Sequence, residues 1–396
     1  MTITFLGTAS AQPSATRNHS ALALRLDGVV WLFDCGEATQ HQVQKSDVKM
    51  GKIQKIFITH THGEHPSLET IVCLKVFETG DHIFGIIPLL ASRLNGAGGM
   101  VDGIEDPRTQ AAANTQTEPL EIYGPLGTRA YIRNGLKYTY TRLGSPYVVH
   151  ELRFPTDPPG DFTALPLHPC ELPSGRDIPQ NEAGVWSDIF SSDVLTVSAA
   201  PIAHSVPCVG YVVHERPIPG KMDPKKYVPE LKRTGTPMSV MSRLQQGESV
   251  ELADGTVLHG PPRRPGRKIV ILGDTFDPSP IAELAVDADV LVHEATNAHL
   301  PGFDPDTKPD ETYESIEERT KSRGHSTPQM AGAFATTIRA TRLLLNHFSA
   351  RYAGNDDVDE DAALVMRVIR ALAQDHFVGK IGCARDLMNV DIPPRK

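Results

Sequence analysis

Two histidines one residue apart, His60 and His62, follow directly after the apolar, β-branched run of residues 53–59. Such a run predicts a buried strand, so both imidazoles lie where the strand ends and can converge on one point. Imidazole nitrogens placed in this way can hold a metal ion. A nearby carboxylate and histidine can hold a second ion, as two-metal hydrolases require. A lone pair of histidines is more often a surface feature, so the interpretation depends on the neighbouring residues.

The motif can continue in two competing ways. Taken directly, the chain offers Glu64 and His65 as the next ligands. If residues 64–80 are passed over, Asp81 and His82 take these places and open an apolar helical stretch. We favour the second interpretation, because an aspartate at the start of a helix can cap its first turn. Glu64 would displace the carboxylate by one methylene.

Residues 64–80 therefore look like an insertion within the motif. The codons around the start of this segment can be written GGTGAGCAT, which contains a splice-donor-like sequence, and those at its end as an acceptor-like CAG followed by GT. We hypothesise that the segment is a short retained intron. If it is translated, the apolar helix that follows favours a loop that leaves Asp81 and His82 at the site.

The same arrangement, an apolar run that ends in an ionisable residue, recurs along the chain. A carboxylate at a strand end, such as Asp274, is placed to bridge two ions and to set their separation at about 3.5–4 Å. Asp34, at the end of a strand predicted over 29–33, can hydrogen-bond a ligating histidine from behind. The predicted strands 195–202, 268–272, 290–292 and 342–345 are followed by His204, Asp274, His293 with Glu294, and His347, while His325 precedes a long helix through residue 337.

Other parts of the chain carry structural signals without chemistry. Residues 2–7 alternate as a strand, and residues 21–33 predict a hairpin that turns at Asp27-Gly28. Residues 155–193 are rich in proline and are expected to be irregular. Residues 362–376 predict an amphipathic helix that packs on the outside of the protein.

Length and composition indicate a globular protein of one large domain or two ordinary ones, with 396 residues, 40% hydrophobic and 22% charged. The five cysteines are scattered without CxxC spacing. This favours a compartment that keeps thiols reduced, so we expect an intracellular protein, cytoplasmic and/or nuclear. No apolar run approaches the roughly 20 residues of a membrane span, and residues 1–11 lack the basic start of a secretory signal. We expect no membrane partner.

The net charge of −9 argues against a uniformly basic nucleic-acid binder, but the charge is uneven. Residues 215–243 carry seven lysines and arginines against three acidic residues, a local net charge of +4. A second basic cluster follows at 263–268. The first segment is poor in large apolar residues, so we expect residues 215–245 to project from the core and to receive a polyanion. The candidate contacts are Lys221, Lys225, Lys226, Lys232 and Arg233.

Taken together, these motifs resemble ribonuclease Z, a branch of the metallo-β-lactamase superfamily. The resemblance rests on HTHG joined to DHIFGIIPLL, on HEAT at 293–296 and on HST at 325–327. The PSATRN sequence at 13–18 is similar to the family's Pro-x-Lys-x-Arg-Asn loop near the RNA, with Ala15 in the lysine place. By this resemblance Arg17 is expected to contact phosphate. Gly235-Thr236-Pro237 is a near match to the Gly-Pro pair of the family's tRNA-binding arm.

The resemblance implies an α/β fold, a four-layer αββα metallo-β-lactamase sandwich over residues 1–396, with a projecting basic arm at 215–245. It implies a zinc-dependent endoribonuclease that acts on precursor tRNA as a homodimer. Such an enzyme removes the 3′ trailer and leaves a 3′-hydroxyl on the tRNA and a 5′-phosphate on the trailer.

The same resemblance implies a role for each site residue. Two zinc ions per chain are expected, whose charge activates a water and stabilises the scissile phosphate. Asp81 is also expected to act as general base and His293 to protonate the leaving oxygen, with Asp34, Glu294 and His325 in supporting positions. His60, His62 and His204 would hold one ion, Asp81, His82 and His347 the other, and Asp274 would bridge them.

Two other functions are compatible with parts of this pattern. A metal-dependent hydrolase of a small phosphodiester or thioester would keep the ligands but would not need the basic arm. A catalytically impaired RNA-binding or dimerisation subunit is the second alternative, because residues 64–80 interrupt the motif. Such a subunit would hold far less than two zinc ions per chain.

Overall fold

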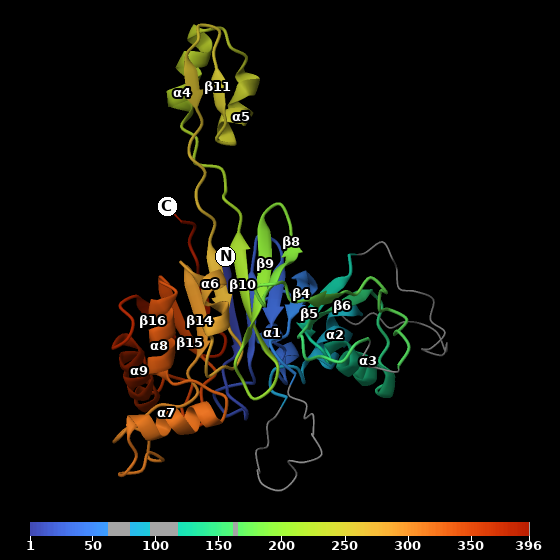
Figure 1. Ribbon diagram of the computed structural model, residues 1–396, viewed down its shortest axis with the longest axis vertical. Coiled ribbons are helices and arrows are strands. Elements are labelled where there is room, and N and C mark those ends of the chain that lie inside the picture. The colour runs from blue at the N-terminus through green and yellow to red at the C-terminus, as the bar shows by residue number, and fades with distance from the viewer. Residues whose placement is uncertain (62–79, 96–117, 161–164, 396) are drawn as a thin grey trace.

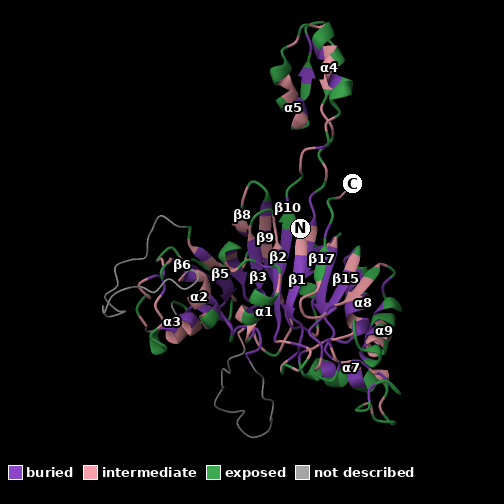
Figure 2. Ribbon diagram, turned by 180° about the vertical axis from the view of Figure 1, so that it is seen from behind, coloured by how far each residue is buried: buried purple, intermediate pink, exposed green. Residues whose placement is uncertain are grey.

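The computed structural model describes residues 1–61, 80–95, 118–160 and 165–395. Two large β-sheets are stacked face to face, helices cover their outer faces, and one small unit projects far from this body (Figure 1). The strands are largely buried, whereas the outer helices and the projecting unit carry most of the exposed residues in the view of Figure 2.

The first sheet combines an antiparallel start with a parallel continuation. Strands β1 to β3 pair antiparallel, and β3 to β7 pair parallel. The predicted hairpin over 21–33 is confirmed, and Gly28 at its turn has φ +84°, which glycine adopts without strain. The sheet order is β17 (Asn389–Asp391), β1 (Thr2–Gly7), β2 (Ala21–Arg25), β3 (Val30–Phe33), β4 (Ile53–Phe57), β5 (Leu120–Pro125), β6 (Tyr147–Arg153) and β7 (Asp177–Pro179).

The second sheet is also mixed. Strands β13 to β16 run parallel, while β8, β9, β10 and β13 pair antiparallel. Strands β9 and β13 both pair antiparallel with β10, which lies between them, so they run in the same direction and bring residues 204 and 274 to the same end of the sheet. The sheet order is β16 (Lys380–Cys383), β15 (Arg342–Asn346), β14 (Val290–Glu294), β13 (Lys268–Ile271), β10 (Cys208–Glu215), β9 (Leu195–Ile202) and β8 (Trp186–Ser191).

Three apolar layers hold the sheets and helices together. Phe57 stacks with Phe33 and Tyr123 between the two sheets, at ring-centroid distances of 5.0 and 5.1 Å. A second layer joins the first sheet to α1 (Thr39–Lys45), α2 (Ile86–Leu94) and α3 (Thr128–Tyr138). A third layer joins the second sheet to α6 (Ala282–Ala285), α8 (Pro328–Thr337) and α9 (Glu360–Gln374).

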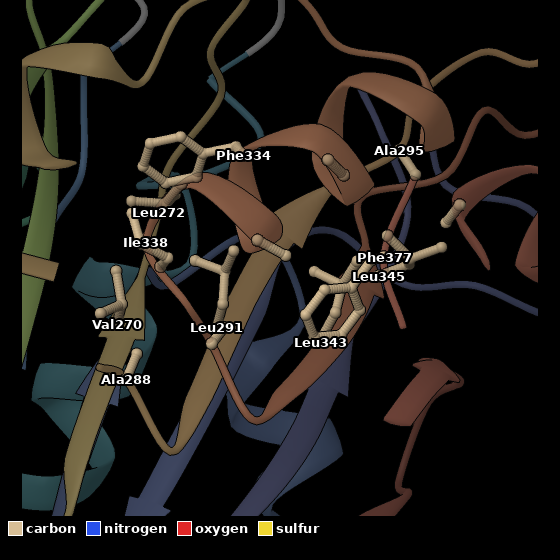
Figure 3. Close-up of a cluster of buried hydrophobic side chains, with 14 of the residues drawn as sticks. Val270, Leu272, Ala288, Leu291, Ala295, Phe334, Ile338, Leu343, Leu345 and Phe377 are labelled. Atoms are coloured by element: carbon tan, nitrogen blue, oxygen red, sulfur yellow. The ribbon is translucent and has the colours of Figure 1, made fainter. Parts of the chain in front are cut away.

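Figure 3 shows this third layer, in which Leu291, Leu343 and Leu345 of the strands meet Phe334 and Ile338. Side chains of a strand alternate between its two faces, so the neighbouring residues of β14 point into the layer between the sheets. The order helix, sheet, sheet, helix confirms the predicted four-layer αββα sandwich. A further helix, α7 (Tyr313–Ser322), lies at the end of the body far from the projecting unit (Figure 1).

Two regions can be compared with what the sequence predicted: residues 155–193, which were expected to be irregular, and residues 362–376, which were expected to form a helix. Within residues 155–193 the chain forms β7 and β8, which extend one edge of each sheet. The buried Arg133 on α3 binds Glu171 through two hydrogen bonds of 2.6 and 2.9 Å, which fixes residue 171 to the helix. Near the C-terminus, the predicted helix is α9, and Asp359 caps it by accepting from the backbone N–H of Ala362.

The projecting unit leaves the body after β10 and returns at β13 (Figure 1). It contains α4 (Pro224–Arg233), α5 (Met241–Gln245) and a hairpin of β11 (Ser249–Glu251) and β12 (Val257–His259), so it extends beyond residue 245. Its own small core consists of Tyr227, Leu231, Leu244, Val250 and Leu252. Within the described residues, no helix is both long enough and apolar enough to cross a membrane.

Candidate metal centre

Ionisable residues from six separate segments, among them His325 before α8, meet where the strands of the sandwich end. His60 follows β4, His204 follows β9, Asp274 follows β13 and His347 follows β15, while Asp81 and His82 precede α2. Among the described residues they form three overlapping groups, and within each group the possible ligand atoms lie within 4.8 Å of one another. The groups are His60, His204 and Asp274; Asp81, His82 and His347; and Asp274, His325 and His347.

Asp274 is the carboxylate that faces both of the main groups. Its Oδ1 lies 3.3 Å from His82 Nε2 and 3.3 Å from His347 Nε2. Its Oδ2 lies 3.9 Å from His60 Nε2. The two oxygens of one side chain therefore point towards two different sets of imidazoles, which is the arrangement that a bridging ligand needs.

The second ring nitrogen of each histidine is held by the protein. Asp34 Oδ2 lies 2.6 Å from His82 Nδ1, and the same carboxylate accepts hydrogen bonds from the backbone and hydroxyl of Thr59. Such contacts fix the ring orientation and turn Nε2 towards the site. The remaining Nδ1 contacts are His60 to Thr59 Oγ1 at 2.9 Å, His204 to Gly324 O at 2.8 Å and His347 to Thr296 Oγ1 at 3.1 Å.

The electrostatics of the site favour a bound cation. Burial opposes the ionisation of Asp81, but the neighbouring His82 and His347 outweigh it and bring its pKa down to about 2. Burial likewise opposes the charge on Asp274, and His347 and His82 hold its pKa well below the ordinary value. Buried carboxylates surrounded by imidazole nitrogens form the nitrogen and oxygen donor set that zinc accepts in proteins. The residues present therefore fit zinc.

The structure brings together most of the predicted ligands. His60, His204, Asp274 and His347 converge as the strand-end pattern indicated. Asp81 and His82 face the same site, 3.8 Å apart between Asp81 Oδ2 and His82 Nε2. The predicted ligand His62, the competing pair Glu64 and His65, and the proposed insertion up to residue 79 lie outside the described residues.

His293, predicted to protonate the leaving oxygen, does not face the site. Its Nδ1 lies 2.8 Å from the carbonyl oxygen of Glu294, and its ring packs near Phe334 of the outer helix layer, 6.0 Å between centroids. The reason is the alternation of β14. Leu291 and His293 point towards α8, so it is the next residue, Glu294, whose carboxylate turns to the site. The predicted role of His293 is therefore wrong.

His325, rather than His293, has its ring beside the carboxylates of the site. Its Nδ1 lies 3.1 Å from Glu294 Oε1 and 3.8 Å from Asp274 Oδ2. Burial opposes the charge on its ring, but Glu294 and then Asp274 more than offset this and raise the pKa of His325 to about 9. Glu294 is itself fixed by hydrogen bonds from the backbone N–H groups of Thr275 and Ser326. The sequence predicted His325 as a supporting residue, and the structure places its ring between the carboxylates of Glu294 and Asp274.

Arg17, expected to contact phosphate, is only 1% exposed. Its Nε donates to the carbonyl of Tyr352 at 2.7 Å, and its Nη1 donates to Thr8 Oγ1 at 2.7 Å and to the carbonyl of Ala384 at 3.0 Å. The guanidinium also lies over the ring of Phe348, 4.5 Å from its centroid. The expected RNA contact is therefore wrong, because these internal contacts keep the guanidinium away from the surface.

The predicted polyanion contacts of the projecting unit do lie on its surface. Lys221, Lys225, Lys226 and Lys232 are exposed. Arg233 is exposed as well, but it forms salt bridges of 2.9 Å to Glu230 and 2.7 Å to Asp254. The four lysines are consequently the better candidates for binding a polyanion.

Comparison with known proteins places this geometry in a family. Zinc phosphodiesterase ELAC protein 1 of Bos taurus is 35% identical over 100% of this chain and 99% of its own length. Ribonuclease Z of Cyanothece sp. strain PCC 7425 is 36% identical over 92% of this chain and 89% of its own. The chain belongs to the ribonuclease Z family. Among solved structures, human tRNase Z, short form, superimposes with a TM-score of 0.59 at 30% identity, covering 99% of this chain and 100% of that one.

More distant similarities concern the fold of this ribonuclease Z family member. The metallo-β-lactamase fold protein YhfI from Bacillus subtilis has a TM-score of 0.51 at 16% identity and covers 98% of both chains. A family model described as anti-Pycsar protein Apyc1 matches residues 1–89. The four-layer sandwich is therefore a metallo-β-lactamase fold, as the sequence motifs implied.

Replacing Asp34 by Ala tests how the ribonuclease Z ligands are oriented. The variant loses the 2.6 Å contact to His82 Nδ1, so we expect its zinc affinity to fall roughly 10–100-fold. The measurement is competition for zinc with a chelator of known affinity. Asp47→Ala, which removes an exposed carboxylate, is the control and should bind zinc like the parent chain. Unchanged zinc binding in Asp34→Ala would show that this carboxylate does not orient a ligand.

Proposed function

We propose that this chain is a zinc-dependent endoribonuclease that cuts precursor tRNA and removes its 3′ trailer. The products are a 3′-hydroxyl on the tRNA and a 5′-phosphate on the trailer. The observation that carries the proposal is the position of Asp274, which faces His60 on one side and His82 with His347 on the other. Similarity to ribonuclease Z of Cyanothece sp. over 92% of this chain supports the choice of substrate.

We assign two zinc ions to the two main groups of ligands. Their chemical contribution when bound is positive charge that polarises the scissile phosphate and lowers the pKa of water at the site. Asp274 would bridge the two positions. His60 and His204, together with the predicted ligand His62, would hold one ion, and Asp81, His82 and His347 the other.

Proton transfer is assigned to two residues on different segments. Asp81 is ionised and accepts the proton of the attacking water, while its Oδ2 is held by the backbone N–H of Ala11 at 2.8 Å. Hydrolysis that leaves a 5′-phosphate on the trailer breaks the bond from phosphorus to the 3′ oxygen of the tRNA. That oxygen needs a proton, and His325 is placed to donate it, with Glu294 fixing its Nδ1.

The projecting unit is proposed to bind the tRNA part of the substrate. Its exposed lysines supply charge for phosphate contacts, and A-form RNA is recognised mainly through backbone and shape. A hydrolase of a small phosphodiester or thioester has no use for such a unit. A catalytically impaired subunit has no use for possible ligand atoms that converge from six segments. We therefore favour the endoribonuclease over both alternatives.

The position of the projecting unit also supports a homodimer. β10 begins at Cys208, whose Sγ lies 3.5 Å from His60 Nδ1, and ends at Glu215, where the projection starts. A strand of this length spans roughly 25 Å, so the unit points away from the metal site of its own chain. We propose that the unit of one chain contacts precursor tRNA held at the metal site of its partner.

We further propose an intracellular location, cytoplasmic and/or nuclear. The described cysteines Cys35, Cys170, Cys208 and Cys383 are free thiols, and three of them are buried. Free thiols are typical of reducing compartments.

The variant Asp274→Ala should lose cleavage of precursor tRNA but keep binding of the same RNA. We expect hydrolysis of a precursor tRNA with a 3′ trailer to fall more than roughly a hundredfold, beyond the usual loss for a residue that only supports a ligand. Binding of the same RNA, measured by fluorescence anisotropy, should persist because the projecting unit supplies the charge.

Asp277→Ala, at an exposed position three residues along, is the matched control and should cleave normally. Mapping of the product ends should show cleavage that leaves a 3′-hydroxyl on the tRNA. Near-normal turnover in Asp274→Ala would remove Asp274 from the site and with it the proposed bridging role.

A loss of RNA binding without a loss of the hydrolytic site is expected when Lys225, Lys226, Lys232 and Arg233 are neutralised together. The apparent KM for precursor tRNA should rise, and the salt dependence of binding should flatten by roughly 0.7–0.9 in slope for each lost phosphate contact. Arg233 should contribute least because it is already paired. Hydrolysis of a small dinucleotide-type phosphodiester should stay unchanged, and an equal loss on both substrates would make the unit structural.

Mixing this variant with Asp274→Ala tests whether the unit acts on the partner chain. The Asp274→Ala chain keeps an intact projecting unit, and the neutralised chain keeps an intact metal site. In a mixed dimer the intact unit of the first chain would serve the intact metal site of the second. Recovered cleavage is the expected result. Cleavage that stays absent in mixtures shown to contain mixed dimers would place both parts on one chain.

A further inference from the structure

The loop of residues 8–18 lies against two ligands of the same metal group. The backbone N–H of Ala11 donates to Asp81 Oδ2 at 2.8 Å. The backbone N–H of Ser10 donates to the carbonyl of Phe348 at 2.9 Å, and the N–H of Phe348 donates to the carbonyl of Thr8 at 2.9 Å. Because Phe348 directly follows His347, the loop connects Asp81 with His347 across the site.

Both ends of this connection adopt backbone conformations that need support. Ala11 has φ +57° and His347 has φ +55°, a left-handed region that side chains other than glycine seldom occupy. Such conformations persist where the surrounding structure fixes them, and they often occur at functional sites. The loop that holds these two residues must therefore be well anchored itself.

Arg17 is the anchor inside this loop. Its guanidinium donates hydrogen bonds to Thr8 Oγ1, which in turn donates to Asp386 Oδ1 at 2.7 Å. The same guanidinium binds the carbonyl of Tyr352 and covers the ring of Phe348, so it links the loop to the chain that follows His347. One buried side chain thus joins the start of the loop to the segment that carries a predicted zinc ligand.

We propose that Arg17 is a positioning residue for the zinc group of Asp81, His82 and His347. It acts by fixing loop 8–18, whose backbone then holds Asp81 Oδ2 and the Phe348 backbone. The inference deepens the proposed function and rests on its two zinc positions. His60 and His204, in the other group, are oriented instead by Thr59 and by Gly324. Loss of Arg17 should therefore affect one zinc position more than the other.

The test compares zinc binding in Arg17→Met, Arg17→Lys and the parent chain. Met keeps much of the side-chain length but has no donors, so we expect one of two zinc ions to be lost to a chelator roughly 10–100-fold more readily while the other is retained. Lys keeps the charge and can donate to fewer partners, so it should restore part of the affinity. The exposed Arg370→Met on α9 is the control and should bind zinc like the parent chain.

Kinetics on precursor tRNA give a second readout. A positioning role predicts a lower kcat in Arg17→Met with KM within about twofold of the parent value, because no RNA contact is removed. Unchanged zinc binding with a raised KM would overturn the proposal in favour of an RNA contact. Equal weakening of both zinc positions would overturn it in favour of general structural support.

Thr8→Val decides the matter if Arg17→Met does not fold. This change keeps the shape of the buried side chain but removes the hydroxyl between Arg17 and Asp386, so it should weaken the same zinc ion selectively. Zinc titration uses no substrate. A selective effect on one ion therefore supports the role of Arg17 even if precursor tRNA proves not to be the substrate, and an unaltered pair of zinc affinities in Thr8→Val contradicts that role.

Discussion

A buried carboxylate at the end of β13 is the constraint on which the site depends. Asp274 is 2% exposed, and burying an ionised carboxylate is costly unless opposite charge surrounds it. The protein surrounds it with His60, His82 and His347, which come from three different segments. A bound metal cation would supply opposite charge to Asp274 and Asp81, which links the chemistry of the site to its stability.

The sandwich explains how such distant segments meet. Parallel strands deliver their carboxyl ends to one edge of a sheet, and the aromatic layer between the sheets holds both edges in register. The projecting unit departs from the other end of β10, so binding charge and chemistry are placed far apart on one chain. This separation is the structural reason for our proposal that RNA affinity and hydrolysis belong to different regions and that the complete reaction uses two chains.

Much of the site could be predicted from the sequence, because His60, His204, Asp274 and His347 each follow an apolar run that ends at the same edge. The choice between Glu64 and Asp81 rested on the helix that follows; the structure groups Asp81 and His82 with His347, whereas Glu64 lies outside the described residues. The layers were predictable for the same reason. Alternation and apolar runs report burial directly, whereas the edge strands β7 and β8 lie in a proline-rich stretch that carries no such pattern.

Two errors show what a linear pattern leaves out. His293 and Glu294 are adjacent, and only the register of β14 between its two layers decides which of them faces the metal groups. Arg17 was expected to contact phosphate because its loop resembles the family's loop near the RNA, but closure of that loop on Tyr352, more than 300 residues later in the chain, buries its side chain.

Anomalous X-ray scattering at the zinc edge from crystals of the zinc-loaded chain tests the central claim most directly. The account predicts two peaks bridged by Asp274, one within about 2.0–2.2 Å of ligand atoms of His60 and His204, and the other equally close to Asp81, His82 and His347. A single peak, or two peaks that do not share Asp274, would contradict it.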